Sequence, residues 1–250
     1  MVVNHLKIAA ILQARMGSSR FPGKVLSEIA GKPLLSHIVE RIQATEKISA
    51  VILATTTSPG DDELAIYAEQ NAIYCYRGEV DDVLARFYGA ATQYKTDIII
   101  RICCDDPLID PDMLNALLEM HLQTKSDYTS TSHVRSFPMG VEAEVFNYDV
   151  LEKAFNLANK NYEREHVTPY FYEHPDLFKL AFLEATGKLR RPDIRLTVDM
   201  PEDMQLIQAI FNGLHRNGRL FRAGDVIDFL DSHPELLLIN KEITQKKLGE

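Results

Sequence analysis

Three cations lie close together in a segment otherwise made mostly of small residues: Arg15, Arg20 and Lys24. The glycines and serines between them allow the backbone to turn sharply and to present N–H groups to an anion. Arginine can also bind phosphate oxygens through two parallel hydrogen bonds. The segment follows an apolar run, residues 8–12, that is typical of a buried strand. The pattern predicts a polyphosphate-binding loop, while composition alone allows a solvated connection between a strand and a helix equally well.

Two familiar phosphate-binding patterns do not describe this loop. In a P-loop, a second glycine precedes lysine and then serine or threonine. Here Gly17 and Gly23 are too far apart for that pattern, and Val25 follows Lys24. The G-x-G-x-x-G dinucleotide pattern is missing as well. Phosphate binding at this loop therefore requires another arrangement.

A pair of carboxylates, Asp105 and Asp106, follows a strand expected at 97–102, whose residues 98–100 form a second apolar run. Hard oxygen ligands of this kind suit Mg²⁺, which commonly uses one or two carboxylates together with substrate phosphates. The pair also stands just before Pro107, as in many turns, and the residues alone favour the turn.

A second acidic segment surrounds Pro201. Asp199 and Glu202 have the spacing of a capping box, and Pro201 suits the first turn of a helix. On the residues alone, a helix cap is the better interpretation of this segment.

The chain has 250 residues, a hydrophobic content of 46% and a net charge of −9. Such a composition is typical of a globular α/β protein, and the negative charge argues against a general nucleic-acid binder. The sequence contains no long apolar span and no recognisable signal peptide, so we expect a cytoplasmic protein without membrane contact. Three cysteines predict free thiols and no disulfide framework.

These chemical residues must be positioned by alternating strands and helices. Strands are expected at 7–13, 50–54, 73–76 and 97–102, and helices at 33–45, 61–71, 81–94 and 111–124. This alternation predicts a mostly parallel sheet, which binds ligands at the carboxyl ends of its strands. The basic loop and the Asp105 turn both follow strands, so both are expected at that edge.

The second half of the chain departs from the alternation. Strands are expected at 128–134 and 141–146, paired antiparallel, and again at 179–184 and 194–198. Helices are expected at 148–159, 163–173 and 201–214. We divide the chain into a main domain at 1–222, with an insertion at about 128–170, and a helical C-terminal annex at 223–250.

Residues 13–20 and 22–26 resemble the signature loop of the sugar-acid cytidylyltransferases, which include the CMP-KDO and CMP-acylneuraminate synthetases. Within that family the match is to the branch named for the spore coat polysaccharide biosynthesis protein SpsF. The resemblance implies a Rossmann-like fold of the nucleotide-diphospho-sugar transferase type, with a small inserted segment for dimerisation and acceptor binding. It also implies that the loop binds the triphosphate of CTP.

The same resemblance assigns roles in the site. The segment around Asp105 is similar to the family's G-D-x-P-L-I element and that around Asp199 to its V-D-x-P-E-D element, so these two carboxylates are the implied Mg²⁺ ligands. Cys104 replaces the usual glycine beside the nucleotide. The implied catalytic residues are Arg15, Lys24, Asp105 and Asp199. The implied nucleotide-binding residues are Ala14, Arg15, Gly17, Ser18, Ser19, Arg20, Lys24 and Cys104.

Further candidates concern the acceptor. Residues 163–170 resemble the R-E-H-V-T-P-Y element of the branch, and 137–146 resemble a segment that shapes the acceptor site and dimer contact in relatives. Without the resemblance, residues 163–170 would be interpreted as a helix whose exposed face carries charges of both signs. Arg195 would then be interpreted as an ion-pair partner of Asp193 or Asp199. The candidate substrate-binding residues are Arg101, Glu142, Glu144, Arg164, His166 and Arg195.

Together these motifs predict a Mg²⁺-dependent, homodimeric cytidylyltransferase that transfers CMP from CTP to a sugar-acid-type acceptor in surface polysaccharide or glycan biosynthesis. Two alternatives remain at this point: a glycosyltransferase that uses a nucleotide sugar, and a non-catalytic nucleotide-binding relative. The acceptor and any general base for its hydroxyl are not specified by the sequence.

Overall fold

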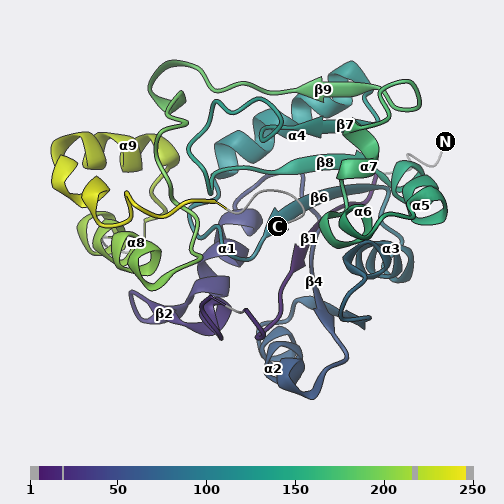
Figure 1. Ribbon diagram of the computed structural model, residues 1–250, viewed down its shortest axis with the longest axis horizontal. Helices are drawn as coiled ribbons and strands as arrows, with labels where there is room; N and C mark the ends of the chain where they lie inside the picture. The colour runs from purple at the N-terminus through teal and green to yellow at the C-terminus, as the bar shows by residue number, and fades with distance from the viewer. Residues whose placement is uncertain (1–5, 19, 216–218, 246–250) are drawn as a thin grey trace.

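The computed structural model describes residues 6–18, 20–215 and 219–245. Its main feature is a twisted seven-stranded sheet covered by helices on both faces (Figure 1). In spatial order, the strands are β5 (Tyr74–Gly78), β4 (Ala50–Thr56), β1 (Ile8–Gln13), β6 (Ile98–Cys103), β8 (Glu144–Asn147), β7 (Tyr128–Ser130) and β9 (Leu180–Phe182). A small hairpin, β2 (Glu28–Ile29) and β3 (Lys32–Pro33), stands apart from this sheet.

Strand direction confirms the predicted fold class. β1 lies between β4 and β6 and is parallel to both. β8 runs antiparallel to β6 and to β7, while β7 and β9 are parallel. The antiparallel pairing expected in the second half therefore occurs, with shorter strands. Residues 128–170, expected as an insertion, contribute β7 and β8 to the main sheet itself.

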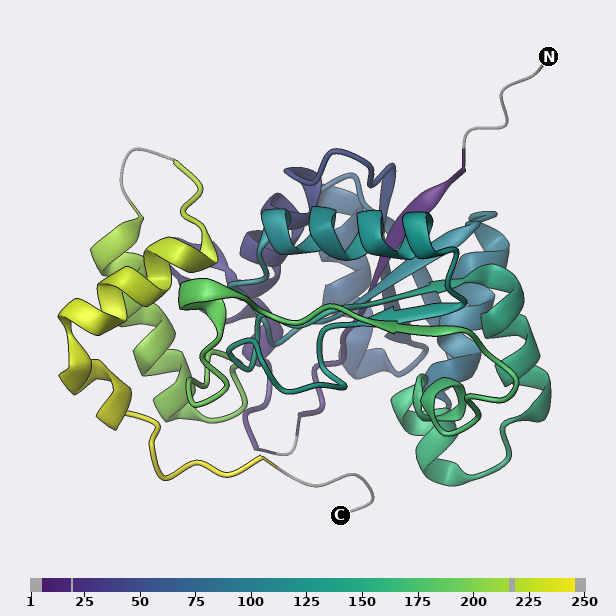
Figure 2. The same cartoon turned by 90° about the horizontal axis from the view of Figure 1, so that it is seen from above.

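Helices form the two outer layers (Figure 2). One core contains Ala10 and Leu12 of β1, and the opposite core contains Ala9 and Ile11, as the alternation of side chains along a strand requires. On the first face pack α1 (Leu34–Gln43), α2 (Asp62–Gln70), α4 (Pro111–Thr124), α8 (Pro201–Leu214) and α9 (Ala223–Ser232). On the second pack α3 (Val83–Gln93), α5 (Tyr148–Leu157) and α7 (Pro169–Tyr172), with α6 (Asn161–His166) beside α3.

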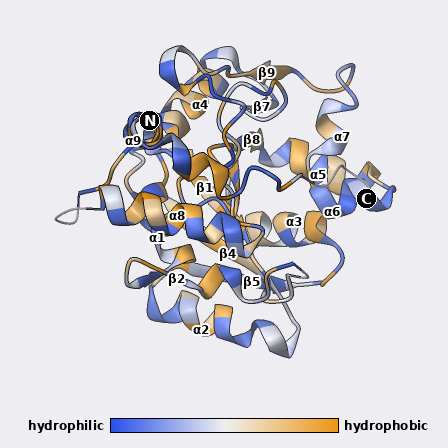
Figure 3. Ribbon diagram, turned by 60° about the vertical axis from the view of Figure 1, so that its left-hand side comes forward, coloured by the Kyte–Doolittle hydropathy of each residue, from blue (hydrophilic) through white to orange (hydrophobic). Residues whose placement is uncertain are grey.

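The apolar strands are enclosed between these layers. Figure 3 shows hydrophobic residues along the centre of the sheet and hydrophilic ones on the outer turns of the helices. In the part of the chain that the structure describes there are also four short 3₁₀ segments: η1 (Lys24–Leu26), η2 (Pro59–Asp61), η3 (Gly187–Leu189) and η4 (Pro234–Leu238). Within the described ranges, no helix combines the length and hydrophobicity that a bilayer crossing demands.

Two expected elements differ from the structure. Residues 194–198 form no strand, and only an isolated bridge joins Arg195 to Met139. The expected helix at 163–173 is divided into α6 and α7, because Val167 has a φ of 71° and leaves the helical conformation. Both deviations lie next to residues of the candidate site, since the first directly precedes Asp199 and the second directly follows His166.

Candidate active site

The basic loop after β1 is held in place by a carboxylate from a neighbouring connection. Asp61 of η2 accepts a hydrogen bond from the backbone N–H of Met16 at 2.7 Å, and its second oxygen accepts one from Thr56. The loop then folds back, since Gly23 N–H donates to the Met16 carbonyl at 3.0 Å. Gly23 has a φ of 71°, a conformation that glycine adopts without strain. This turn directs Lys24 into the protein.

Lys24 lies between the two carboxylates that the sequence motifs single out. Its Nζ is 2.9 Å from Asp105 Oδ2, 2.9 Å from Asp199 Oδ1 and 2.7 Å from the Val198 carbonyl oxygen. Burial by itself would lower the pKa of Lys24, but Asp105 and Asp199 raise it above its usual value. The ammonium is therefore charged, and it joins Asp105 and Asp199 in one cluster.

Asp199 occupies this position although the segment before it, residues 194–198, is not a strand. The Val198 N–H donates to the Asp105 carbonyl oxygen at 2.8 Å, and this bond ties the Asp199 segment to the turn after β6. The predicted capping box is wrong in its detail. Asp203, not Glu202, accepts from the N–H groups of Asp199 and Met200, at 2.9 and 3.0 Å. The carboxylate of Asp199 is thus left for other contacts.

Two further cations contact Asp199. Arg20 Nη2 lies 2.9 Å from Oδ1, and Arg195 Nη2 lies 3.0 Å from Oδ2. Arg195 also binds Asp203, so the sequence-based alternative of a structural partner holds for Arg195, with Asp203 in place of Asp193. Burial would raise the pKa of Asp199, but Lys24 together with these arginines lowers it below the usual value. Asp199 is an anion surrounded by positive charge.

The geometry fits a divalent cation at this position. A single ammonium contacts Asp105 and Asp199 at once, so one cation can be shared by both carboxylates. Carboxylate oxygens are the donors that Mg²⁺ prefers. A second grouping overlaps this one, because ligand atoms of Cys103, Asp105 and Asp106 lie within 4.8 Å of one another. Asp105 belongs to both, and burial raises the pKa of Asp106 well above its usual value.

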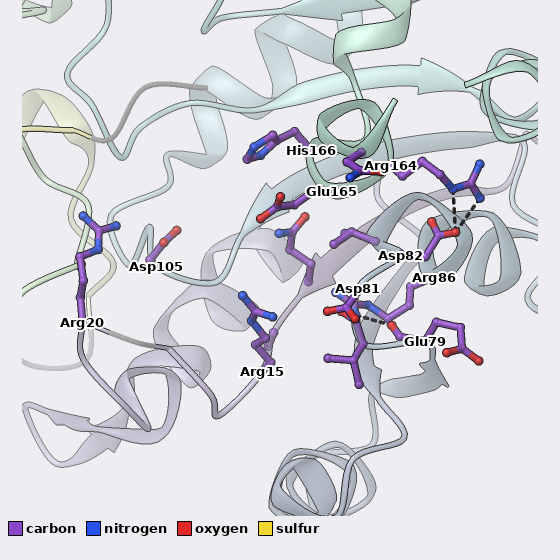
Figure 4. Close-up of a pocket in the computed structure, with 15 residues that line it drawn as sticks. Arg15, Arg20, Glu79, Asp81, Asp82, Arg86, Asp105, Arg164, Glu165 and His166 are labelled. Carbon is purple, nitrogen blue, oxygen red and sulfur yellow. Dashed lines mark hydrogen bonds and ion pairs between the residues drawn. The ribbon is translucent and has the colours of Figure 1, made fainter. Parts of the chain in front are cut away.

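An open cavity of about 990 Å³ begins beside this cluster (Figure 4). It extends from the loop after β1, past Asp105, to the segment after β5 and to α6. Of the site residues predicted from the sequence, those that line the cavity are Ala14, Arg15, Arg20, Asp105, Arg164 and His166. Sequence reasoning missed Gln13, Glu79, Asp81, Asp82, Arg86, Asn161 and Glu165. For the segment at 79–82 a signal existed, since it follows the carboxyl end of parallel strand β5.

Three acceptor candidates are engaged in internal pairs. Arg101 on β6 and Glu144 on β8 face each other in the sheet register and form a buried ion pair, to which the Tyr128 hydroxyl also donates. Arg164 binds Asp82 at the start of α3, with Nε 2.7 Å from Oδ2. These contacts anchor the walls of the site.

The other residues predicted for the site that the structure describes do not line this cavity, and they differ in burial and in contacts. Glu142 is partly buried, and burial raises its pKa to about 7 despite the nearby Arg135. The Cys104 side chain packs in the hydrophobic core and does not line the cavity. Gly17 is exposed, and Ser18 accepts a hydrogen bond from the Phe21 N–H at 3.4 Å. Ser19 lies outside the described residues.

The fold and the site define a class: an α/β nucleotide-binding enzyme with cations and carboxylates at the carboxyl edge of its parallel strands. The family described as Cytidylyltransferase matches residues 9–232. The chain is also 33% identical, over 233 residues, to the spore coat polysaccharide biosynthesis protein SpsF of Bacillus subtilis, covering 91% of this chain and 95% of that protein. The chain belongs to the cytidylyltransferase family and is a nucleotidyltransferase, which confirms the resemblance seen in its motifs.

Solved structures agree with this assignment. A cytidylyltransferase from Leptospira borgpetersenii superposes with a TM-score of 0.87 at 28% identity, covering 97% of this chain and all (100%) of the other. A CMP:2-keto-3-deoxy-manno-octonic acid synthetase, solved with CTP, gives a TM-score of 0.61 at 18% identity and shares the fold, covering 83% and 99% of the two chains.

Proposed function

We propose that this cytidylyltransferase transfers CMP from CTP to a sugar-acid acceptor, releases pyrophosphate and uses Mg²⁺. The observation that carries the proposal is the convergence of Asp105 and Asp199 on one cation, beside a cavity lined by Arg15 and Arg20. The names of a relative and of a neighbour, which mention polysaccharide biosynthesis, a sugar acid and CTP, support the choice of substrates.

The chain's own residues perform positioning and charge compensation. Arg15 and Arg20 bind the triphosphate, because guanidinium groups match phosphate oxygens in geometry and charge. Asp105 and Asp199 hold Mg²⁺, which supplies charge stabilisation at the phosphates when it is bound. The Lys24 ammonium contacts both carboxylates and compensates their charge. Preorganised charge of this kind stabilises the negative charge that develops on the leaving pyrophosphate.

Substrate screening tests the proposal directly. Pyrophosphate release would be measured with Mg²⁺ and CTP, UTP, ATP or GTP, each against a panel of sugar acids that includes 3-deoxy-manno-octulosonate and N-acetylneuraminate. A parallel arm would supply UDP-sugars, the substrates of the glycosyltransferase alternative. We expect acceptor-dependent pyrophosphate release with CTP. Turnover of UDP-sugars, or no pyrophosphate with any acceptor, would contradict the proposal.

We also propose that the protein acts as a homodimer in the cytoplasm, as expected from its family resemblance. A two-fold dimer would bury roughly 1,000 Å² or more in total. Light scattering across a range of protein concentrations would test the assembly, and a monomer at every concentration would exclude it.

A further inference from the structure

The sequence motif around His166 lies on one wall of the cavity. Figure 4 shows His166 and Glu165 directed into the space that Asp105 and Arg15 also border. Among the described residues, no hydrogen bond or ion pair engages the His166 ring, and its pKa responds only to burial and to the charges of Glu165 and Arg101. An imidazole without protein partners is thus presented to the substrate space.

The short helix that carries His166 is anchored firmly at its start. Glu163 is buried, and its Oε2 accepts hydrogen bonds from the N–H groups of Asn159 and Lys160, each at 3.1 Å. Next to it, Arg164 binds Asp82 of the α3 N-terminus and two backbone carbonyl groups. These neighbours of His166 are therefore committed to holding α6 in place.

The backbone directly after His166 is strained. Val167 has φ 71° and ψ −55°, and the Thr168 N–H donates to the His166 carbonyl oxygen at 2.8 Å. These values describe a γ-turn of the rare, positive-φ kind, which a β-branched residue adopts only under constraint. The Val167 side chain is fully buried in the second core, which holds the turn. Such strain persists where packing enforces it and is concentrated at functional sites.

We propose that His166 is a catalytic residue that binds the attacking hydroxyl of the acceptor and removes its proton. The inference rests on the proposed function. As the acceptor oxygen bonds to the α-phosphorus of CTP, its proton passes to a ring nitrogen of His166. The bond between the α-phosphorus and the oxygen bridging to the β-phosphate breaks, and pyrophosphate departs with that electron pair. His166 then releases the proton to solvent.

The electrostatic surroundings suit a base. Burial lowers the pKa of His166 below its usual value, which keeps the ring neutral near pH 7, although Glu165 acts in the opposite direction. A neutral imidazole can accept a proton, whereas imidazolium cannot. Charged groups that line the same cavity are Arg15 and Arg20 of the basic loop, Asp105 of the turn after β6, Glu79, Asp81 and Asp82 between β5 and α3, Arg86 of α3, and Arg164 and Glu165 of α6. Arg101 of β6 does not line the cavity, but its charge also lowers the pKa of His166.

The test compares the wild type with His166→Gln, using CTP, Mg²⁺ and the sugar acid from the panel that releases pyrophosphate fastest, with 3-deoxy-manno-octulosonate as the first probe. We expect kcat to fall by about 100-fold or more, with the KM for CTP changed by less than about threefold. The wild-type kcat should decline on the acid side as His166 takes up a proton, and this decline should be missing in His166→Gln. His166→Asn provides a second variant, with thermal melts as a check on folding.

The matched control is His174→Gln, because His174 lies on the same part of the chain but binds the Tyr170 carbonyl oxygen and does not line the cavity. It should retain the wild-type kcat and pH profile. If His166→Gln keeps a kcat within threefold of wild type and the same acid decline, the inference is overturned while the proposed function stands. If the wild type itself releases no pyrophosphate with any acceptor, the proposed function and the inference both fail.

Discussion

Lys24 Nζ lies 2.9 Å from Asp199 Oδ1, and the same atom lies 2.9 Å from Asp105 Oδ2. With Arg20 and Arg195 also in contact with Asp199, three cations surround two carboxylates. An incoming divalent ion therefore meets a site that is already neutralised. A triphosphate changes this balance, because it offers Lys24 and the arginines other anionic partners. We expect metal and nucleotide binding to be coupled through Lys24.

Replacing Lys24 with methionine should uncouple metal binding from nucleotide binding. Lys24→Met leaves Asp105 and Asp199 without their shared ammonium, so Mn²⁺ should bind more tightly in the absence of CTP, by about tenfold or more. CTP should bind more weakly. Mn²⁺ affinity can be measured by the electron paramagnetic resonance of the free ion, with and without CTP.

Lys32→Met is a suitable control for this measurement. Lys32 pairs with Glu40 on the surface, away from the site, so its loss should leave Mn²⁺ affinity unchanged. Equal Mn²⁺ affinity of the wild type and Lys24→Met would show that Lys24 does not compete with the metal.

Removing Arg15 should weaken CTP binding without loss of stability. Arg15 is exposed at the cavity, so its removal should leave the folding stability unchanged. Each charged contact that it makes with phosphate would contribute on the order of 1.5–3 kcal/mol of binding free energy. Titration calorimetry of Arg15→Ala with CTP measures this directly. Arg190→Ala, which removes only a surface pair with Glu184, should bind CTP like the wild type. An unchanged CTP affinity in Arg15→Ala would remove the basis for the polyphosphate loop.

Gly140 supports the segment that carries Asp199. It has a φ of 92°, and a Cβ there would lie 2.4 Å from the Thr197 nitrogen. Gly140→Ala should therefore lower the free energy of unfolding by at least about 2 kcal/mol and reduce turnover, because backbone atoms must move. Gly60→Ala, where an added Cβ meets nothing closer than 3.9 Å, should change stability by less than about 0.5 kcal/mol. Chemical denaturation of both variants makes the comparison, and equal stability would contradict it.

Glu142 should make stability depend on pH near neutrality. Burial raises its pKa to about 7, so the unfolded state loses this proton at lower pH than the folded state. The free energy of unfolding should then fall as pH rises from about 4.5 to 7. Glu142→Gln removes this loss and should stabilise the protein by roughly 1–3 kcal/mol at pH 8, with little effect at pH 4. A stabilisation of equal size at both pH values would show that ionisation is not its cause.

The parallel half of the fold was predictable because its signals are local. The run 98–100 is apolar throughout, as the centre of a strand buried on both faces must be. The start of α4 is likewise set locally, because Asp110 accepts from the N–H groups of Asp112 and Met113. The strand expected at 194–198 failed because its apolar residues pack into the core from an irregular segment, held by contacts with residues 105 and 139.

The site was predictable in its members more than in its contacts. Asp105 and Asp199 were both named from motifs, but the buried Lys24 between them depends on a turn at Gly23 and on contacts distant in sequence. Likewise, nothing in the order of residues indicates that Arg101 pairs with Glu144, because that pair follows from the register of β6 and β8.

The central claim, that Asp105 and Asp199 hold the metal for nucleotidyl transfer, is tested most directly by Asp105→Asn and Asp199→Asn. Pyrophosphate release would be measured across a Mg²⁺ titration with CTP and the best acceptor of the panel. Each variant should lose about 100-fold or more in kcat, and the double variant should be little worse than either, since the two residues act as a unit. Asp193→Asn, which disturbs only an exposed pair with Arg191, should remain active. Full activity and an unchanged Mg²⁺ dependence in Asp199→Asn would contradict the account.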